Sequence, residues 1–240
     1  MTRENRTGQP SGVWSGVLKA LTAVGVLGIV SLGAGHLAWK YSGSNQWQPV
    51  IEKDGIKIYS RKTPGFVLKD WKGIRRVRTT LNGAVAAMTS TKTEDCAEWY
   101  RNCVSVQSVQ PWNSLQLSYI HLFRTEYPAP FGAREILVEA RASQEAQSKA
   151  VVVQFVARPN DLPPNECCVR ITEYHNTWRF GPRDGGDREV ELVVHMDQKL
   201  PYFLVNRVAP GALYKVFSRL PELFNEEKWQ HAKFDSIEEQ

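Results

Sequence analysis

The stretch Arg188–Leu220 reads REVELVVHMDQKLPYFLVNRVAPGALYKVFSRL and contains two different hydrophobic periodicities in succession. Up to Met196, apolar residues alternate with polar ones, which is typical of a strand with one buried face. After Pro201 the apolar residues recur at helical spacing over about five turns. Pro210 is expected to kink this helix and Pro221 to end it. A half-buried strand that leads into a long amphipathic helix predicts a curved antiparallel sheet wrapped around that helix.

The preceding part of the chain contains further short stretches of alternating apolar and polar residues, separated by turns rich in Gly, Pro, Asn and Asp. Helical patterns occur only early and late in the chain, which predicts the α+β class with an antiparallel sheet. The expected strands cover residues 56–61, 71–80, 104–109, 115–124, 134–142, 151–157, 168–180 and 188–196. Two short helices are expected over residues 82–89, with Asn82 as the N-cap, and over residues 94–101.

The segment from Ala20 to Trp39 contains no Lys, Arg, Asp or Glu and is flanked by Lys19 and Lys40. Twenty residues at about 1.5 Å per residue cover about 30 Å, the thickness of a hydrocarbon core. Residues 20–40 are therefore predicted to form a transmembrane anchor, after a disordered tail (1–19) and before a flexible linker (41–46). A cleaved signal peptide is the alternative, because small residues at 33–35 have suitable spacing.

The net charge is +5 and the isoelectric point about 9.0. This mild basicity suits an anionic lipid surface as a partner, and it is too weak and dispersed to indicate nucleic acid binding. The basic residues before the apolar segment lie in a short tail, which favours a folded domain on the exported side of the membrane. The sequence identifies no protein partner.

The four cysteines, Cys96, Cys103, Cys167 and Cys168, have no spacing typical of a zinc site. The adjacent Cys167 and Cys168 are poorly placed to bond to each other. We expect all four to be structural residues or free thiols, with little to say about the cellular compartment.

Five stretches follow one another along the chain: DGIKIYSR (54–61), KGIR (72–75), YPAPFGARE (127–135), WRFGP (178–182) and LPYFLVN (200–206). In this order they resemble START domains, the lipid-binding modules of the helix-grip superfamily. Glu135 and Ala129 differ from the family's usual residues, and residues 196–199 lack its glycine pair.

The resemblance places a START-like domain at residues 47–225, followed by a C-terminal tail (226–240). It implies an elongated apolar tunnel between the sheet and the long helix. Such domains bind a sterol, phospholipid or similar apolar molecule, and carry or present it at a membrane. The residues expected to line the tunnel are Tyr119, His121, Phe123, Arg134, Ile136, Val138, Val190, Leu192, Val194, Met196, Leu213 and Phe217.

The polar members of this set have two interpretations each. Arg134 is either a cation for a lipid hydroxyl or phosphate, or a partner of Glu126 or Glu135 in an internal ion pair. Tyr119 and His121 are either polar groups at the inner end of a cavity or core residues paired with the backbone.

The sequence contains no HExxH, GxSxG, P-loop or GxGxxG motif, and its histidines have no metal-ligand spacing. We therefore expect a binding protein with no cofactor, no metal and no catalytic residue. Two alternatives stay open. One is a helix-grip enzyme of the cyclase or hydrolase type that acts on an apolar substrate. The other is a membrane-anchored interaction or sensor module whose interior is filled.

Overall fold

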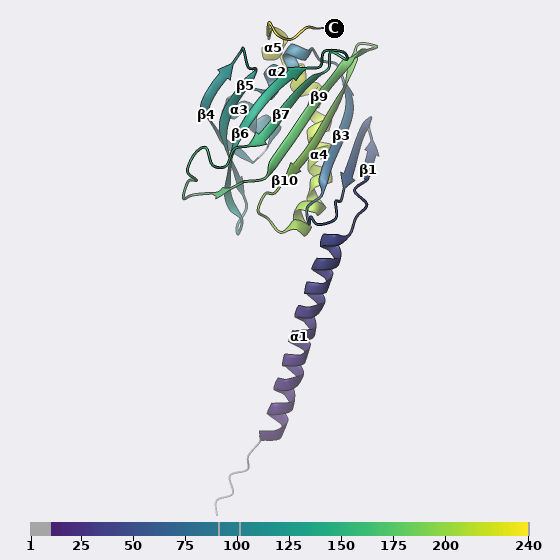
Figure 1. Cartoon of the computed structure of the whole chain (residues 1–240), viewed down its shortest axis with the longest axis vertical. Coiled ribbons are helices and arrows are strands. Elements are labelled where there is room, and N and C mark those ends of the chain that lie inside the picture. The colour runs from purple at the N-terminus through teal and green to yellow at the C-terminus, as the bar shows by residue number, and fades with distance from the viewer. Residues whose placement is uncertain (1–10, 91, 101, 240) are drawn as a thin grey trace, which may run out of the picture.

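Strand β10 (Asp187–Met196) and helix α4 (Tyr202–Phe224) follow one another as the periodicity predicts. They are part of a computed structural model that describes residues 11–90, 92–100 and 102–239. The sheet is curved, and α4 lies on its inner face (Figure 1). The predicted α+β, helix-grip architecture is therefore confirmed.

The sheet contains ten strands, and its main path runs β1-β2-β3-β10-β9-β7-β6-β5-β4. Neighbours along this path are antiparallel, whereas the two-residue strand β8 (Val169–Arg170) pairs in parallel with β6. The other strands are β1 (Trp47–Lys53), β2 (Ile56–Arg61), β3 (Asp70–Val77), β4 (Cys103–Asn113), β5 (Ser118–Tyr127), β6 (Gly132–Gln144), β7 (Val151–Ala157) and β9 (Tyr174–Asp184).

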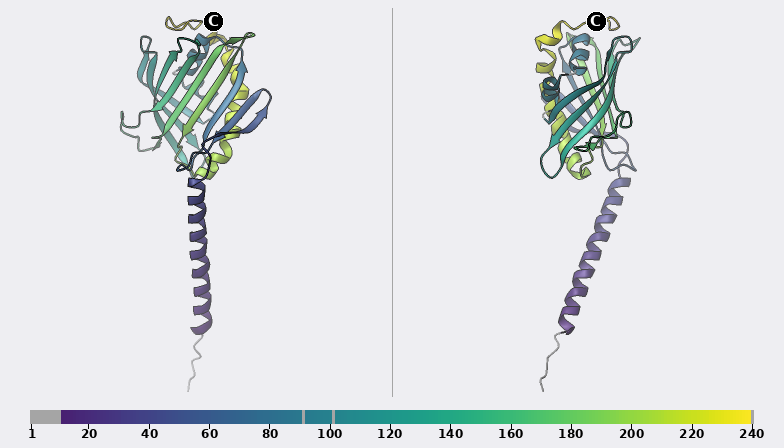
Figure 2. Two further views of the ribbon diagram at one scale, coloured as in Figure 1. Left: turned by 45° about the vertical axis from the view of Figure 1, so that its right-hand side comes forward. Right: turned by 90° about the vertical axis from the view of Figure 1, so that its left-hand side faces the viewer.

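The β1-β2-β3 end of the sheet, with the neighbouring β10 and β9, provides the surface on which α4 packs. Leu192 of β10 lies opposite Gly73 of β3 on one side and Trp178 of β9 on the other. A side chain at Gly73 would overlap the ring of Phe217 from α4, so glycine is what allows the helix to approach the sheet here. Helix α4 packs on β1, β2 and β3 (Figure 2).

Helix α4 passes through both of its prolines, so the prediction that Pro221 ends it is wrong. A proline inside a helix leaves the carbonyl group four residues earlier without its usual N–H donor. For Pro221 that carbonyl belongs to Phe217, and the guanidinium of Arg75 donates to it at 2.5 Å and to Ser218 O at 2.9 Å. Arg75 thus supplies from β3 the hydrogen bond that the helix loses, and α4 continues to Phe224.

Residues 226–239, predicted as a C-terminal tail, are part of the folded domain. Helix α5 (Glu227–Gln230) follows α4, and the side chain of Ile237 is buried. The carboxylate of Glu239 accepts hydrogen bonds from the backbone N–H groups of Leu81 and Asn82, at the start of α2 (Leu81–Met88). The N-cap of α2 is Thr80, whose hydroxyl accepts from Gly83 N–H, and not Asn82 as predicted.

All four cysteines form disulfides, which corrects the expectation for them. Cys96 of α3 (Thr93–Trp99) is bonded to Cys103 of β4, and Cys167 is bonded to its neighbour Cys168. Sequence spacing did not reveal the first pair, because the two sulfurs meet only where α3 turns back onto β4. For the second pair, the expectation that adjacent cysteines are poorly placed to bond to each other was wrong.

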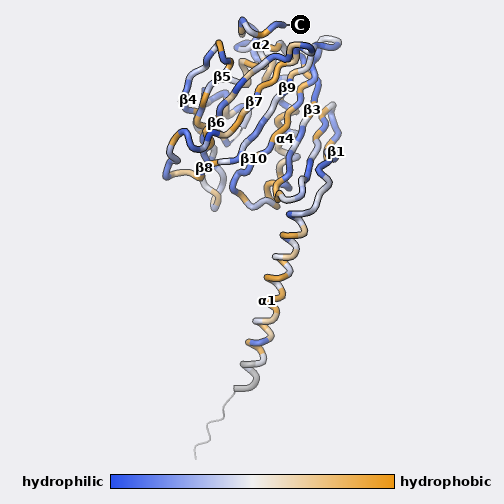
Figure 3. The backbone as a smooth tube through the Cα atoms, viewed as in Figure 1, coloured by the Kyte–Doolittle hydropathy of each residue, from blue (hydrophilic) through white to orange (hydrophobic). Residues whose placement is uncertain are grey.

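Helix α1 (Ser11–Tyr41) projects away from the sheet (Figures 1 and 2), and its apolar residues extend along most of its length (Figure 3). Within Gly16–Tyr41, the most apolar 18-residue window has a mean hydropathy of 2.0 and none of that window is buried, so the helix is long and apolar enough to span a membrane or to act as a signal sequence. Part of the predicted disordered tail, residues 11–19, is helical; residues 1–10 lie outside the described range.

The linker after α1 is exposed but contacts the loop between β2 and β3. Gly43 has φ = +104°, and a side chain there would overlap the backbone and side chain of Lys62. Asn45 N–H donates to Lys62 O at 3.1 Å. The composition of the linker does not show these contacts, and its flexibility stays a prediction.

Candidate ligand site

Strand β5 presents Tyr119, His121 and Phe123 to the inner side of the sheet. Tyr119 and His121 are 1% and 0% exposed, and their ring centroids lie 3.9 Å apart. Phe123 is partly buried, with its ring 6.0 Å from that of His121. The tyrosine hydroxyl lies 3.4 Å from Met88 O, a long hydrogen bond, and burial raises the pKa of Tyr119. An aromatic row with two polar groups therefore faces the interior.

His121 is the most unusual member of this row. Neither ring nitrogen has a hydrogen-bond partner among the described residues. Burial lowers the pKa of His121 to about 4, so the ring is neutral at pH 7. A neutral imidazole still has one donor and one acceptor, and leaving buried polar groups unpaired costs about 1–3 kcal/mol each. The imidazole can therefore form hydrogen bonds with a polar group of a molecule that enters the interior.

A second polar group comes from β9. The amide of Asn176 is 3% exposed and donates to the hydroxyl of Tyr174 at 2.8 Å, while its Oδ1 has no partner among the described residues. Tyr100 is 47% exposed, yet burial of its hydroxyl raises its pKa, and the side chains of Tyr174 and Asn176 act to lower that pKa. Tyr100 and Tyr119 both affect the pKa of Tyr174, which burial raises well above its usual value. The four residues therefore lie close together.

The end of the interior next to the second half of α4 is filled with aromatic rings. Trp178 of β9 stacks on Phe217 at 5.8 Å between centroids and on Phe180 at 6.3 Å. Phe224 packs against Phe180 and against Trp99 of α3, at 5.6 Å in both cases. The expectation of a tunnel along the whole helix is therefore wrong in this half. The partly accessible inner residues Phe123, Tyr174, Val194 and Met196 belong to the other half.

Arg134 matches neither of its two interpretations. It is 5% exposed, and its guanidinium donates to the carbonyl groups of residues 131, 132, 198 and 199 and lies over the ring of Tyr127. Glu135 instead pairs with Arg170 at 2.7 Å and accepts from Asn165. Arg134 thus fastens the loop before α4 to the start of β6, and its donors are occupied by the backbone.

The remaining predicted site residues are brought together around one interior. Apart from His121, which stacks on Tyr119, they belong to or pack against a single hydrophobic cluster: Tyr119, Phe123, Ile136, Val138, Val190, Leu192, Val194, Met196, Leu213 and Phe217. Tyr100, Tyr174 and Asn176 were not predicted. The alternation of Tyr174, Asn176 and Trp178 with polar residues is the same signal that singled out β5 and β10, whereas nothing local marks Tyr100.

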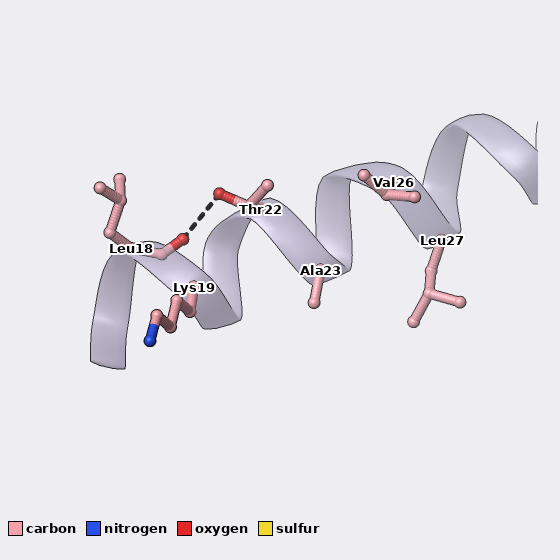
Figure 4. Close-up of a pocket in the computed structure, with 6 residues that line it drawn as sticks. All are labelled: Leu18, Lys19, Thr22, Ala23, Val26 and Leu27. Carbon is pink, nitrogen blue, oxygen red and sulfur yellow. Dashed lines mark hydrogen bonds between the residues drawn. The ribbon is translucent and has the colours of Figure 1, made fainter. Parts of the chain in front are cut away.

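Two hollows lie away from this interior. One, of about 660 Å³, follows a single face of α1 and is lined only by α1 residues, such as Leu18, Thr22 and Val26 (Figure 4). The hydroxyl of Thr22 donates to Leu18 O at 2.8 Å, as suits a helix in lipid. The other, of about 250 Å³, is lined by Thr63, Phe66, Leu68, Asp70 and His195.

In chemical terms, the interior offers hydroxyl, amide and imidazole groups within an apolar, aromatic surround. The described residues contain no group of three or more His, Cys, Asp or Glu side chains that could hold a metal ion. The basic side chains nearest the interior are engaged: Arg134 by carbonyl groups, and Arg188 by Glu239. The arrangement suits a largely apolar molecule with one uncharged polar group.

Comparison with solved structures identifies the architecture. A STAR-related lipid transfer protein fragment from Xanthomonas axonopodis superposes with a TM-score of 0.66 at 19% identity, covering 75% of this chain and 99% of that one. The chain has the START fold. The human StarD13 lipid transfer and protein localization domain (TM-score 0.61, 15% identity, 82% and 97% covered) and human StAR-related lipid transfer protein 5 (0.59, 14%, 85% and 98%) have the same fold.

The START fold was recognisable only through coordinates and short ordered motifs. No protein-family model matches the sequence, and no curated protein matches it. At these identities the neighbours establish the fold of the domain.

Proposed function

We propose that this chain is a membrane-anchored lipid-binding protein that takes up one lipid between the sheet and the first half of α4. The lipid carries an uncharged hydrogen-bonding group, such as a hydroxyl, and the protein binds and releases it without a chemical step. The observation that carries the proposal is the set of buried polar atoms that have no hydrogen-bond partner among the described residues, the two ring nitrogens of His121 and Oδ1 of Asn176, in a largely apolar interior.

The energetics favour this class of ligand. Apolar surface transferred from water stabilises the bound state by about 25 cal/mol per Å². A hydroxyl group that pairs with the imidazole of His121 also removes the cost of leaving that group unpaired. A phosphate would need a compensating cation in the interior, and the guanidinium of Arg134 is already surrounded by carbonyl oxygens.

We also propose that α1 anchors the protein and that the domain lies on the exported side of the membrane. The two disulfides support this side, because such bonds persist in oxidising compartments and are rare in the cytosol. A cleaved signal sequence would place the domain in the same compartment without an anchor. Carbonate extraction distinguishes the two, since an anchored protein stays with the membrane.

The test of lipid binding uses the full chain, purified in a mild detergent. Native mass spectrometry should detect one bound lipid, and a fluorescent sterol or diacylglycerol should enter more readily than a fluorescent phosphatidylcholine. His121→Phe keeps the ring volume and removes its polar atoms, so the affinity should fall about tenfold, equivalent to about 1.4 kcal/mol. His175→Gln, on the exposed face of β9, is the matched control. A protein that contains no lipid and takes up neither probe would contradict the proposal.

A further inference from the structure

The C-terminal end of α1 is joined to the domain by a dense set of contacts centred on Lys62. The ammonium group of Lys62 lies within hydrogen-bond distance of the carbonyl oxygens of Lys40 (3.2 Å), Ser42 (3.3 Å), Thr63 (3.2 Å) and Phe66. Gly65 N–H also donates to Lys40 O at 2.8 Å. The last carbonyl groups of a helix have no partner within it, and a cation there is favourable. The loop after β2 therefore caps α1.

Trp39 connects the same helix end to α4. Its indole N–H donates to Val67 O at 2.8 Å, and its ring stacks on Tyr202 with an interplanar angle of 13°. The side-chain amide of Asn206 donates to the same Val67 carbonyl at 3.0 Å and accepts from Lys69 N–H at 3.0 Å. One backbone carbonyl is thus shared by α1 and α4, and His36 packs edge-on against Tyr202. These contacts, with the Lys62 cap, form what we call the anchor joint.

The anchor joint determines which part of the domain lies beside the end of α1. Figures 1 and 2 show the first turns of α4 next to this end of the helix, while the C-terminus lies at the opposite end of the domain. Four large apolar side chains are exposed near the joint: Phe66 (55%), Phe203 (61%), Leu204 (39%) and Val208 (62%). Lys69 lies three residues after Phe66, and the exposed Arg207 lies between Leu204 and Val208. We call these six residues the docking surface.

The composition of the docking surface matches the interface of a bilayer. Aromatic and aliphatic side chains enter the boundary between headgroups and acyl chains, and Lys and Arg pair with anionic headgroups. A helix that spans the membrane and ends at Trp39 and Tyr41 places this boundary at the level of the anchor joint. The surface is therefore continuous with the membrane-facing end of α1.

We propose that the anchor joint is rigid and holds the docking surface against the leaflet in which α1 ends. The domain then exchanges its ligand with that leaflet alone and does not swing to a second membrane. The direction of exchange rests on the proposed function, including insertion of α1, whereas docking itself requires no ligand.

The experiment places a fluorophore on the docking surface of the full chain in vesicles of phosphatidylcholine and phosphatidylglycerol. Val208→Cys carries the label, and Leu115→Cys, 94% exposed in the turn between β4 and β5, is the distant control. Because the native cysteines are all in disulfides, each variant has one reactive thiol. A nitroxide lipid should quench the label at position 208 severalfold more than the label at 115. Equal, weak quenching at both positions would overturn docking.

Rigidity is tested in the same vesicles with two variants of the anchor joint. Lys62→Met removes the cap of α1, and Gly43→Ala introduces an overlap with Lys62. Either should reduce quenching at position 208 toward the value at 115, whereas Lys53→Met, an exposed lysine at the end of β1, should not. Unchanged quenching in both joint variants, with a helical circular dichroism spectrum intact, would overturn the rigid joint.

The two remaining occupants of the docking surface give different results. If a second copy or another protein covers it, the label at position 208 is protected from aqueous iodide but not quenched by the nitroxide lipid, and docking on the membrane is overturned. If the proposed function fails but docking holds, the protein takes up no lipid probe while the label at position 208 is still strongly quenched.

Discussion

Arg188 and Glu239 meet inside the protein although 51 residues separate them in the chain, with the guanidinium Nη2 3.2 Å from the carboxylate. Arg188 is fully buried and also donates to Thr79 O and Gly181 O at 3.1 Å. Burial alone would raise the pKa of Glu239, but hydrogen bonds from the N–H groups of Asn82 and Leu81 lower it below its usual value. The carboxylate of Glu239 thus holds the C-terminal segment both to Arg188 and to the N-terminus of α2.

We expect Glu239→Gln to lower the free energy of unfolding by about 2 kcal/mol, because it removes a charged acceptor from a buried cation and from the N-terminus of α2. The contribution of Glu239 is present above its usual pKa and is lost as the pH falls through its lowered value. Urea unfolding at pH 7 provides the measurement. The neighbouring Glu238→Gln, which breaks only an exposed pair with Lys149, should change stability by less than about 0.5 kcal/mol. If the two substitutions lower the free energy of unfolding equally, the contact between Glu239 and Arg188 does not stabilise the fold.

Gly73→Ala should destabilise the domain by about 1–3 kcal/mol, because the new methyl group overlaps the ring of Phe217. Combining it with Phe217→Leu should recover part of that loss, since the smaller side chain leaves room for the methyl group. A double-mutant cycle of thermal unfolding measures this coupling. Gly181→Ala is the control, because its methyl group would lie at 3.4 Å or more from its neighbours. Additive effects of the first two changes would mean that α4 does not approach the sheet through Gly73.

Removing the Cys96–Cys103 disulfide with serines should lower stability by about 2 kcal/mol, because it releases a seven-residue loop in the unfolded chain. Replacing Cys167 and Cys168 should have a much smaller effect, since a bond between neighbours closes no loop of chain. Thermal melts of the two double-serine variants, beside the oxidised wild type, make the comparison. A larger loss at 167 and 168 would show that the second bond supports the fold in another way.

Stability should depend on pH through His195. Its Nδ1 lies 2.7 Å from Asp70 Oδ1, and this hydrogen bond raises the pKa of His195 against the opposing effect of burial. A raised pKa means that the contribution of His195 is fully present below its usual value of about 6.5 and is lost as the pH rises through the raised value. The melting temperature of the wild type should therefore fall relative to His195→Gln between about pH 6 and the raised pKa.

The control for this prediction is His231→Gln, an exposed histidine near the C-terminus, which should melt with the same pH dependence as the wild type. If the difference in melting temperature between the wild type and His195→Gln does not change with pH, the hydrogen bond between His195 and Asp70 makes no pH-dependent contribution to stability.

Local periodicity determined most of the secondary structure. The expected strand 151–157 agrees with β7 (Val151–Ala157) residue for residue, and the inward residues of β5 and β10 were identified by alternation alone. The end of α4 could not be predicted, because the donor that allows it to pass Pro221 comes from Arg75, far away in the chain. The contacts of Arg134 with the carbonyl groups of residues 198 and 199 were missed for the same reason.

For the candidate site, the sequence by itself determined that Tyr119 and His121 point inward, because strand side chains alternate between two faces. It could not determine what stands opposite them. Only the tertiary structure decided that Asn176 and Tyr174 share this interior, that aromatic rings fill its far half, and that Glu239 reaches Arg188. The physical reason is that a periodic pattern specifies the direction of a side chain, whereas its partner depends on which distant segments the folded chain brings within a few ångströms.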